Sequence, residues 1–300
     1  MIEGALVLTG PTASGKSSLA IELSQHVDME IISADSVQVY RGMNIGTAKP
    51  PLNILESIPH HLLDIRQPTE TYSAAEFRQD ILKLVPEIRG RGRLPVIVGG
   101  TMLYLKLLKQ GLAELPQADQ AIREEINLLA LERGWGAVYQ ELKMVDPDSA
   151  RRIKPTDTQR LQRALEVYRI SGSTITDLQK VLPPVCPFPL KEIGIMPVDR
   201  SKLHESISNR FHRMLERGFL EEVIALKSNP EIHRELPAIR AVGYRQIWSY
   251  LDGEIDYNEM VRKSIFATRQ LAKRQYTWLR NWESMVFLEF PNLAGVLKII

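Results

Sequence analysis

Three hundred residues, 44% of them hydrophobic, are enough for one large or two modest globular domains and exclude a disordered chain. A net charge of +2 is too small to indicate an acidic partner, so the distribution of charge along the chain has to decide. The single cysteine, Cys186, excludes an internal disulfide and a cysteine-based zinc site.

The amino terminus, MIEGALVLTG, carries no basic leader, and its apolar run is far shorter than the roughly 20 residues that cross a bilayer. A single free cysteine is what a reducing compartment permits. We therefore expect a monomeric cytoplasmic protein that has no membrane partner.

The first part of the chain alternates short apolar runs with helical stretches, as in α/β proteins. The strands expected from such runs are 5–9, 30–34, 95–98 and, later in the chain, 192–198. Ser73 and Glu76 form a capping box that opens a helix running toward Gly90. Strands separated by helices predict a parallel sheet covered by helices on both faces, with ligands at the carboxyl ends of the strands.

The pattern changes after Leu115-Pro116, since Asp119 to about Ser171 shows helical periodicity and little that resembles a strand. The closely spaced prolines of LPPVCPFPL, Leu182 to Leu190, predict an extended connector that leaves this region. We expect an α/β core formed by residues 1–117 and 191–300, with an inserted all-helical subdomain at 118–190. Further helices are expected in the core near 201–217, 219–227, 243–251 and 257–281.

The segment GPTASGKS lies between an expected strand and an expected helix, the context that identifies a phosphate-binding loop. Such a loop turns backbone N–H groups inward at the amino terminus of a helix, while its lysine adds charge and its serine can bind Mg²⁺. The motif therefore predicts a site for a diphosphate or triphosphate. Its residues are Gly10, Pro11, Thr12, Ala13, Ser14, Gly15, Lys16 and Ser17.

A nucleotide-hydrolysing enzyme normally has a partner strand ending in an acid that holds Mg²⁺ and water. Here the strand in LPVIVGGTMLYL ends in Gly99, Gly100 and Thr101 instead. Asp64, at the end of another apolar run, is a possible substitute, although a surface or helix-capping aspartate is the better interpretation. Asp35 follows a strand at the expected ligand edge, and its alternative is to cap a short turn.

Two stretches of the chain concentrate positive charge. Between Arg262 and Trp282 there are six lysines and arginines and no acid, and Arg262, Arg269, Lys273 and Arg280 fall within about 40° on a helix. A second group, between Ala150 and Arg169, contains several arginines. A solvated basic face is the simpler interpretation of either one, but together they favour a phosphate-backbone partner.

Motifs along nearly the whole chain resemble those of the tRNA dimethylallyltransferase family, also called tRNA isopentenyltransferases. They occur in the family's order: GPTASGKS, ISADS, YRGMNIGTAKP, PHHLLDI, YSAAEFR, VGGTMLYLKLL, DPDSARRI, DTQRLQRALEVY, AVGYRQIWSYLDGEI and TRQLAKRQYTWLRNW. The resemblance implies transfer of a dimethylallyl group from dimethylallyl diphosphate to the N6 amine of the adenine beside the tRNA anticodon, A37. It also implies Mg²⁺ as cofactor.

The resemblance assigns roles to particular side chains. Asp35 accepts the proton of the adenine amine, Thr101 contacts the leaving diphosphate unless it only caps the following helix, and Arg210 neutralises the diphosphate. The helical insertion is implied to clamp the tRNA. The implied tRNA contacts are Asp35, Ser36, Val37, Gln38, Thr101, Arg123, Gln159, Arg160, Leu161, Gln162, Arg163, Arg240, Ala241, Val242, Gly243, Tyr244, Arg245, Lys273, Arg274, Trp278 and Arg280.

Two other functions share some of these features. A small-molecule kinase would use the phosphate loop and the parallel sheet, but it has no need of two basic stretches. A nucleic-acid-binding module would bind tRNA without alkylating it. Ser17 stands where the family more often has threonine, and the zinc-finger extension of eukaryotic relatives is missing, so we expect the shorter bacterial type.

Overall fold

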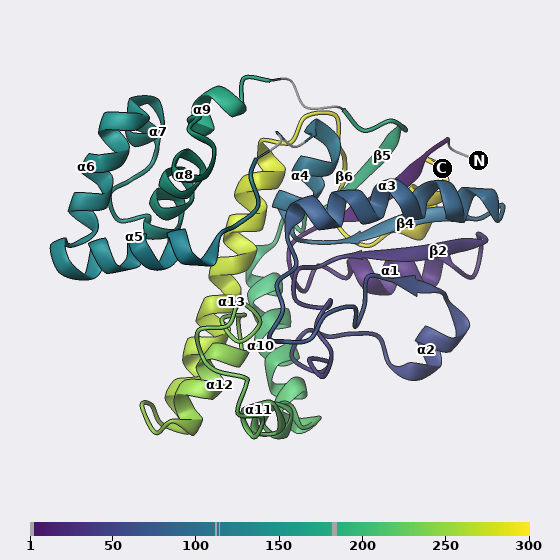
Figure 1. Cartoon of the computed structure of the whole chain (residues 1–300). Helices are drawn as coiled ribbons and strands as arrows, with labels where there is room; N and C mark the ends of the chain where they lie inside the picture. The colour runs from purple at the N-terminus through teal and green to yellow at the C-terminus, as the bar shows by residue number, and fades with distance from the viewer. Residues whose placement is uncertain (1–2, 112, 114, 182–184) are drawn as a thin grey trace. The chain divides into compact units, whose positions relative to one another are not determined.

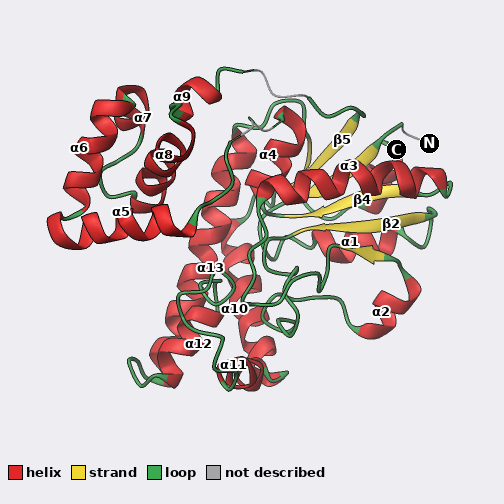
Figure 2. Ribbon diagram, viewed as in Figure 1, coloured by secondary structure: helices red, strands yellow, loops and turns green. Residues whose placement is uncertain are grey.

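The computed structural model describes residues 3–111, 113, 115–181 and 185–300. Their contacts divide the chain into two compact units, Met1–Lys109 with Cys186–Ile300, and Gln110–Val185. All strands of the described residues belong to the first unit, and the second consists of helices and their connections (Figures 1 and 2). The predicted fold class, a parallel α/β sheet with an inserted helical subdomain, is confirmed.

The first unit is built on one six-stranded sheet in which every pairing is parallel. Its order is β3-β2-β4-β1-β5-β6. The strands are β1 (Ala5–Thr9), β2 (Met29–Ala34), β3 (His60–His61), β4 (Leu94–Gly99), β5 (Leu190–Ile195) and β6 (Val286–Leu288). Every residue of β1, β2 and β4 is buried, which explains their continuous apolar runs.

Helices cover the two faces of this sheet because successive strand residues point to opposite sides. On one face Leu6 and Leu8 belong to a core with α1 (Lys16–Leu23) and α14 (Leu293–Leu297). On the other face Ala5 and Val7 belong to a core with α3 (Ala74–Gly90) and α4 (Met102–Gln110). Figure 1 shows α3 lying across one face of the strands.

The capping box that opens α3 is confirmed. The Ser73 hydroxyl accepts a hydrogen bond from the Glu76 N–H at 3.1 Å, and the Glu76 carboxylate accepts one from the Ser73 N–H at 2.8 Å. A cap of this kind contributes roughly 1 kcal/mol to a helix. It fixes the start of α3 at the residue where the sequence predicts it.

The remaining helices of the first unit are α2 (Leu52–Ser57), α10 (Arg200–Glu216), α11 (Phe219–Lys227), α12 (Tyr244–Leu251) and α13 (Tyr257–Arg280). The longest, α13, begins at an Asp256 cap and runs side by side with α10 (Figure 1). Leu203 and Ile207 of α10 pack against Ala272 and Tyr276 of α13. This apolar contact sets the spacing of the two helices that flank the candidate site.

The second unit contains α5 (Gln120–Arg133), α6 (Trp135–Val145), α7 (Pro147–Arg152), α8 (Thr158–Ser171) and α9 (Ile175–Leu178). Ile126, Val138, Leu142, Leu161 and Leu165 are part of its separate core. The insertion is predicted at 118–190, whereas this unit occupies Gln110–Val185 and β5 already begins at Leu190. Of the predicted connector at 182–190, residues 182–184 lie outside the described residues.

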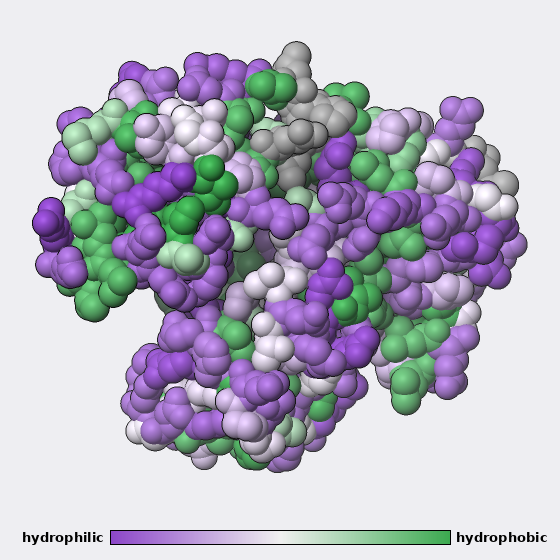
Figure 3. Space-filling view, in the orientation of Figure 1, coloured by the Kyte–Doolittle hydropathy of each residue, from purple (hydrophilic) through white to green (hydrophobic). Residues whose placement is uncertain are grey.

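The described surface is mostly hydrophilic on the face shown in Figure 3, with apolar residues scattered between polar ones. Within the described ranges, no helix is both long enough and apolar enough to cross a membrane.

Candidate functional site

Three neighbouring strands end side by side, and each leads into one of the predicted functional segments. In the sheet β4 lies between β2 and β1, and Gly99 is the register partner of both Ala34 and Thr9. The Thr9 hydroxyl donates to the Gly99 carbonyl at 2.8 Å, and the Thr101 N–H donates to the Ala34 carbonyl at 3.2 Å. The phosphate loop, the Asp35 turn and the Gly-Gly-Thr turn therefore leave the sheet at one edge.

The phosphate loop has a backbone suited to an anion. Ala13 and Gly15 have positive φ angles of 64° and 86°, so alternation of left-handed and right-handed residues turns N–H groups toward one side. Gly15 is the N-cap of α1 and offers no side-chain acceptor, which leaves the first N–H groups of α1 to bind a ligand. The Ser14 hydroxyl is buried and has no hydrogen-bond partner among the described residues, as expected for a group that binds a ligand.

Lys16, Arg210 and Asp35 form one electrostatic group at this edge. Burial and, to a lesser extent, the Arg210 charge lower the pKa of Lys16 to about 8 against the opposing effect of Asp35. Burial also lowers the pKa of Arg210, and again the Asp35 carboxylate opposes the shift. Two cations share a single anion here, so the site has excess positive charge and favours a ligand with negative charge.

The same edge suits Mg²⁺ bound through a diphosphate. The described residues hold no cluster of three or more metal-ligating side chains, so a caged metal site is not formed by them. Protein-bound Mg²⁺ often needs only one or two protein ligands besides phosphate oxygens and water. Ser17, in the exposed first turn of α1, offers one such oxygen.

The two predicted catalytic oxygens lie on turns that brace each other. Asp35 Oδ1 accepts hydrogen bonds from the N–H groups of Val37 at 2.9 Å and Gln38 at 3.4 Å. Thr101 Oγ1 accepts one from the Ser36 N–H at 3.0 Å. The turn-capping alternative for Asp35 is therefore realised through Oδ1, and the contacts described for this carboxylate involve only that oxygen. A carboxylate held by one oxygen is well placed to use the other on a substrate.

The glycines at the end of β4 explain why no acid stands there. A Cβ at Gly99 would lie 2.2 Å from the Ala34 carbonyl oxygen, which belongs to the β2 backbone. A Cβ at Gly100 would lie 2.4 Å from Nε2 of Gln275. The backbone contact excludes a side chain at Gly99, whereas a side chain at Gly100 would displace the Gln275 amide, so the last residue of β4 cannot be the acid that a hydrolase would need.

Gln275 of α13 joins the phosphate loop to this turn. Its Oε1 accepts from the Thr12 N–H at 2.8 Å, and its Nε2 donates to the Gly100 carbonyl at 2.9 Å. The side chain is 7% exposed, so both bonds are shielded from water. Sequence reasoning missed Gln275 because a glutamine within a basic helix carries no pattern that reveals a contact with residues so distant in sequence.

Replacing Gln275 with alanine is expected to weaken binding of a diphosphate-bearing substrate by about 10-fold. It should also lower the free energy of unfolding by about 1–3 kcal/mol, because two polar backbone groups lose their partners. The KM for the diphosphate-bearing substrate and the thermal midpoint of unfolding measure these effects. Gln270→Ala, on the same helix but outside this cavity, should change neither by more than twofold or a degree or so. Equal behaviour of the two variants would show that Gln275 does not position the loop.

A cavity of about 440 Å³ opens beside this edge. Asp35, Thr101 and Arg210 line it, together with Thr12 of the phosphate loop. Apolar side chains from three helices form another part of its wall; they are Ile207, Phe211, Met214, Phe219 and Tyr244. The cavity thus combines a polar end, where the charged groups meet, with an apolar wall suited to a hydrocarbon group.

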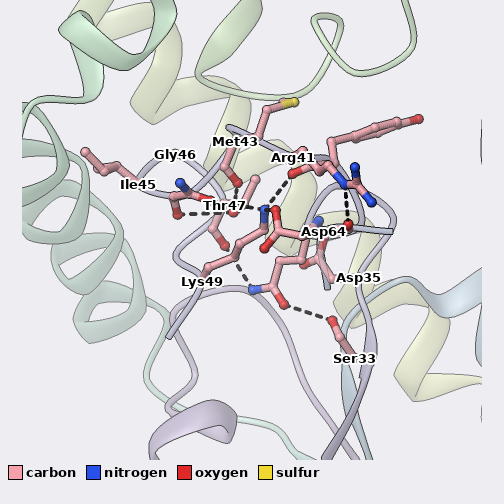
Figure 4. Close-up of polar contacts among 12 residues, drawn as sticks. Ser33, Asp35, Arg41, Met43, Ile45, Gly46, Thr47, Lys49 and Asp64 are labelled. Carbon is pink, nitrogen blue, oxygen red and sulfur yellow. Dashed lines mark hydrogen bonds and ion pairs between the residues drawn. The ribbon is translucent and has the colours of Figure 1, made fainter. Parts of the chain in front are cut away.

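The loop that follows Asp35 is held by a buried lysine. Lys49 Nζ donates to the Tyr40 carbonyl at 2.5 Å and to Asp64 Oδ1 at 2.6 Å, as Figure 4 shows. Asp64 also accepts from Arg41 through its backbone carbonyl, at 2.8 Å. The Asp64 carboxylate is thus bound to Lys49 and does not line the cavity, so the structure gives no support to Asp64 as a substitute acid.

Glu222 of α11 secures the far part of the same loop. Its carboxylate accepts from the N–H groups of Asn44, Ile45 and Gly46 at 2.8, 2.7 and 3.1 Å. It also accepts from the Tyr244 hydroxyl at 2.6 Å, and burial together with this carboxylate raises the pKa of Tyr244. These bonds hold Gly46 in contact with the rings of Phe219 and Tyr244, where an added Cβ would lie 2.2 Å from the Phe219 ring.

Glu222→Gln is expected to cost about 1.5–3 kcal/mol of folding stability, because an amide cannot accept all four hydrogen bonds. The thermal midpoint of unfolding should fall and the KM for the diphosphate-bearing substrate should rise, since the loop forms part of the cavity wall. Glu221→Gln is the matched control, because Glu221 is exposed on the same helix turn. If both variants melt alike, Glu222 does not hold the loop.

The predicted tRNA contacts in the first unit lie in three places. Asp35, Ser36, Val37, Thr101, Arg240, Ala241, Val242, Gly243, Tyr244, Arg274 and Trp278 line the cavity. Arg245 lines a neighbouring depression, and Lys273 and Arg280 line a further cavity along α13. Gln38 is turned away, since its amide bonds Ser33 at 2.8 Å and Thr47 at 3.1 Å.

The predicted contacts in the second unit are largely engaged within it. Arg123 and Arg163 both bond the buried Glu166, at 2.8 and 2.7 Å. Gln162 bonds Asn127 at 2.8 Å, Arg160 pairs with Asp157 at 3.1 Å, and Gln159 is exposed. The side chain of Leu161 is fully buried in the core, so its expected contact with tRNA is not available through the side chain as folded.

Comparisons with known proteins point to one family. A sequence model of the IPP transferase family matches residues 38–282. A tRNA isopentenylpyrophosphate transferase from Bacillus halodurans is 35% identical, with a TM-score of 0.68 over 96% of this chain and 90% of that one. A tRNA delta(2)-isopentenylpyrophosphate transferase from Staphylococcus epidermidis is 32% identical, with a TM-score of 0.69 over 98% and 96%.

A eukaryotic dimethylallyltransferase acting on tRNA is also similar. It is 28% identical, with a TM-score of 0.78 over 92% of this chain and 69% of that chain. The family match covers most of the chain and includes Arg210 and all of α13, while the phosphate loop and Asp35 precede the matched residues.

Proposed function

We propose that this chain, which belongs to the IPP transferase family, transfers a dimethylallyl group from dimethylallyl diphosphate to N6 of A37 in tRNA. The observation that carries the proposal is the meeting of Lys16, Arg210 and Asp35 at an edge where β4 ends without an acid. Such a site can hold a diphosphate and accept a proton, and it lacks the group at β4 that would activate water.

The reaction requires one bond to form and one to break. The N6 lone pair of the adenine forms a bond to C1 of the donor, and the bond between C1 and the bridging oxygen breaks. The electron pair of that bond leaves with the diphosphate, and the N6 proton passes to the Asp35 carboxylate. General-base catalysis of this kind typically contributes 10²–10⁴-fold to the rate.

The residues at the strand ends fit these demands. Lys16, Arg210 and the N–H groups of the loop would neutralise the charge that develops on the departing diphosphate. The Thr101 hydroxyl, braced against the Asp35 turn, would contact its bridging oxygen. Ser17 would hold Mg²⁺, which when bound lowers the charge of the leaving group. The apolar wall of the cavity would take the five-carbon chain and limit access of water.

A small-molecule kinase is not favoured. That chemistry needs a residue that positions the nucleophile beside the transferred phosphoryl group and a second acidic ligand for the metal. The backbone of β2 leaves no space for an acidic side chain at Gly99, and the Asp64 carboxylate is bound to Lys49. A binding module without catalysis would not need a carboxylate poised beside two cations.

The partner and setting follow from the same proposal. The cations of α13 suit the phosphates of a tRNA anticodon stem-loop, and we propose that the protein acts on it as a monomer in the cytoplasm. Burial raises the pKa of the Cys186 thiol, which favours its protonated, less reactive form.

Mixing the protein with Mg²⁺, radiolabelled dimethylallyl diphosphate and unmodified tRNA tests the proposal. Label should enter the RNA and should be found on N6 of A37 after digestion to nucleosides. A tRNA with guanine at that position should receive none, which makes it the matched control. Turnover of ATP on a small acceptor, without transfer of label, would contradict the proposal and favour the kinase.

A further inference from the structure

A second cavity, of about 480 Å³, lies between α10 and α13. It uses residues of α13 other than those that line the reaction cavity, so the two cavities occupy different faces of one helix. Its polar and aromatic lining includes Arg200, His204, Arg269, Lys273, Tyr276 and Arg280. Three of the four residues of the basic stripe recognised in the sequence therefore converge on it.

The charge of this cavity is uncompensated. No Asp or Glu lines it among the described residues, and none of its arginines, nor Lys273, takes part in an ion pair described for this structure. By contrast, Arg163 and Arg169 in the helical unit are paired with glutamates. The Arg269 Nε atom is buried and has no hydrogen-bond partner in the part of the chain that the structure describes. A buried guanidinium donor left unpaired is costly unless a ligand completes it.

The helices that carry these cations are held together, while Arg200, Lys273 and Arg280 themselves are exposed to solvent. Leu203 and Ala272 pack in the apolar contact between the two helices and also line the cavity. Arg200 lies over the Tyr276 ring, 5.7 Å from its centroid. The Tyr276 hydroxyl donates to the Pro197 carbonyl, which fixes the ring itself. Guanidinium groups fixed around a concave surface match the oxygens of a phosphate.

We propose that this cavity binds a backbone phosphate of the RNA substrate on the face of α13 opposite the reaction cavity. The inference rests on the proposed function and adds Arg200, His204 and Arg269 to the RNA-binding surface. A helix is only about 10–12 Å wide, so an RNA strand delivering its adenine to Arg274 and Trp278 can cross α13 within a few nucleotides.

An RNA strand suits the cavity better than a free phosphate ion. Phe266, 63% exposed, lines the cavity and offers a ring on which an unpaired base or its sugar can pack. The same residue also lines the next depression along the helix, with Arg245 and Arg274. This depression, in which Glu254 is paired with Arg234, shares Phe266 with the cavity and Arg274 with the reaction cavity, so the cavity is not isolated.

Arg269→Gln tests the proposal through binding alone. Affinity for a fluorescent anticodon stem-loop, measured by anisotropy without donor, should fall about 10-fold, and the slope of log K against log salt should decrease by about one. Arg262→Gln removes the same charge from an exposed site on the same helix, outside every described cavity, and should change affinity less than twofold. Equal losses in both variants would overturn the assignment.

Neutral linkages identify the phosphate. A single methylphosphonate at each linkage of the stem-loop should weaken binding to the protein with Arg269. At the linkage that the cavity binds, the same replacement should not weaken binding to Arg269→Gln any further. If every linkage costs the same in both proteins, the cavity holds no backbone phosphate. Thermal melting of Arg269→Gln shows whether the variant is folded. Arg269→Lys restores the positive charge and should regain part of the affinity for the stem-loop.

These outcomes are separable from the fate of the proposed function. If the protein binds RNA with this pattern but transfers no label, the proposal for the cavity stands and the proposed reaction is wrong. A protein that transfers label while Arg269→Gln binds as tightly as the original keeps the reaction and loses the cavity.

Discussion

Replacing Asp35 with asparagine is expected to lower the rate of transfer at saturating substrates by about 10²–10⁴-fold, the range typical of a lost general base. Asparagine retains an oxygen that can accept from the Val37 and Gln38 N–H groups, so the turn should keep its form. Affinity for tRNA should stay within a few-fold. Single-turnover transfer of labelled donor, together with RNA binding, separates these effects.

Asp28→Asn is the matched control for this experiment. Asp28 is an exposed carboxylate just before the amino end of β2, while Asp35 follows the carboxyl end of the same strand. The control should transfer label at the original rate. An Asp35→Asn enzyme that keeps more than a tenth of the original rate would remove Asp35 from the role of base.

Replacing Lys16 with methionine is expected to lower kcat/KM for the donor by about 10²–10³-fold, as for other groups that stabilise developing negative charge. Lys83→Met, on the exposed side of α3, removes a lysine that does not line the site and should have no effect. A loss below 10-fold in Lys16→Met would show that the loop holds the diphosphate by its N–H groups alone.

The lowered pKa of Lys16 makes this prediction sensitive to pH. With a pKa of about 8, the free enzyme carries the Lys16 charge below pH 8 and loses it as the pH rises above that value. Hence kcat/KM for the donor should fall above about pH 8, whereas kcat should fall only at higher pH because the bound diphosphate favours the charged form. The fall in kcat/KM should be absent from Lys16→Met; its persistence there would assign it to another group.

The parts of the site that follow from local sequence could be predicted well. The phosphate loop needs only the order of a strand, a glycine-rich turn and a helix, and Ala5–Thr9 and Lys16–Leu23 supply it. Asp35 follows from its place after a buried strand, because parallel strands end at one edge. The capping box of α3 depends on residues only three apart.

Contacts between distant segments could not be predicted in this way. Gln275 lies 263 positions from Thr12, and Glu222 lies 178 positions from Asn44. Neither residue is set apart by helix periodicity, since both occur on helices rich in polar side chains. The short edge strands β3 and β6, of two and three residues, were also missed because a period of two cannot be recognised over such lengths.

Charge patterns were informative about location but not about pairing. The arginines near Ala150 to Arg169 and those of α13 look alike in sequence. In the structure the buried Glu166 binds Arg123 and Arg163, while no ion pair joins Arg269 to a carboxylate of the described residues, and its Nε has no hydrogen-bond partner among them. Whether a cation is available to RNA therefore depends on where the acids of the fold come to lie, which only the tertiary structure shows.

The central claim is that the site holds a diphosphate so that the carbon attached to it is attacked, and a donor labelled with ¹⁸O in the bridging position tests this most directly. We predict that all the ¹⁸O leaves in diphosphate, with one diphosphate released for each dimethylallyl group gained by the RNA and no ATP consumed. Recovery of the ¹⁸O in dimethylallyl alcohol would mean attack at phosphorus and would contradict the account.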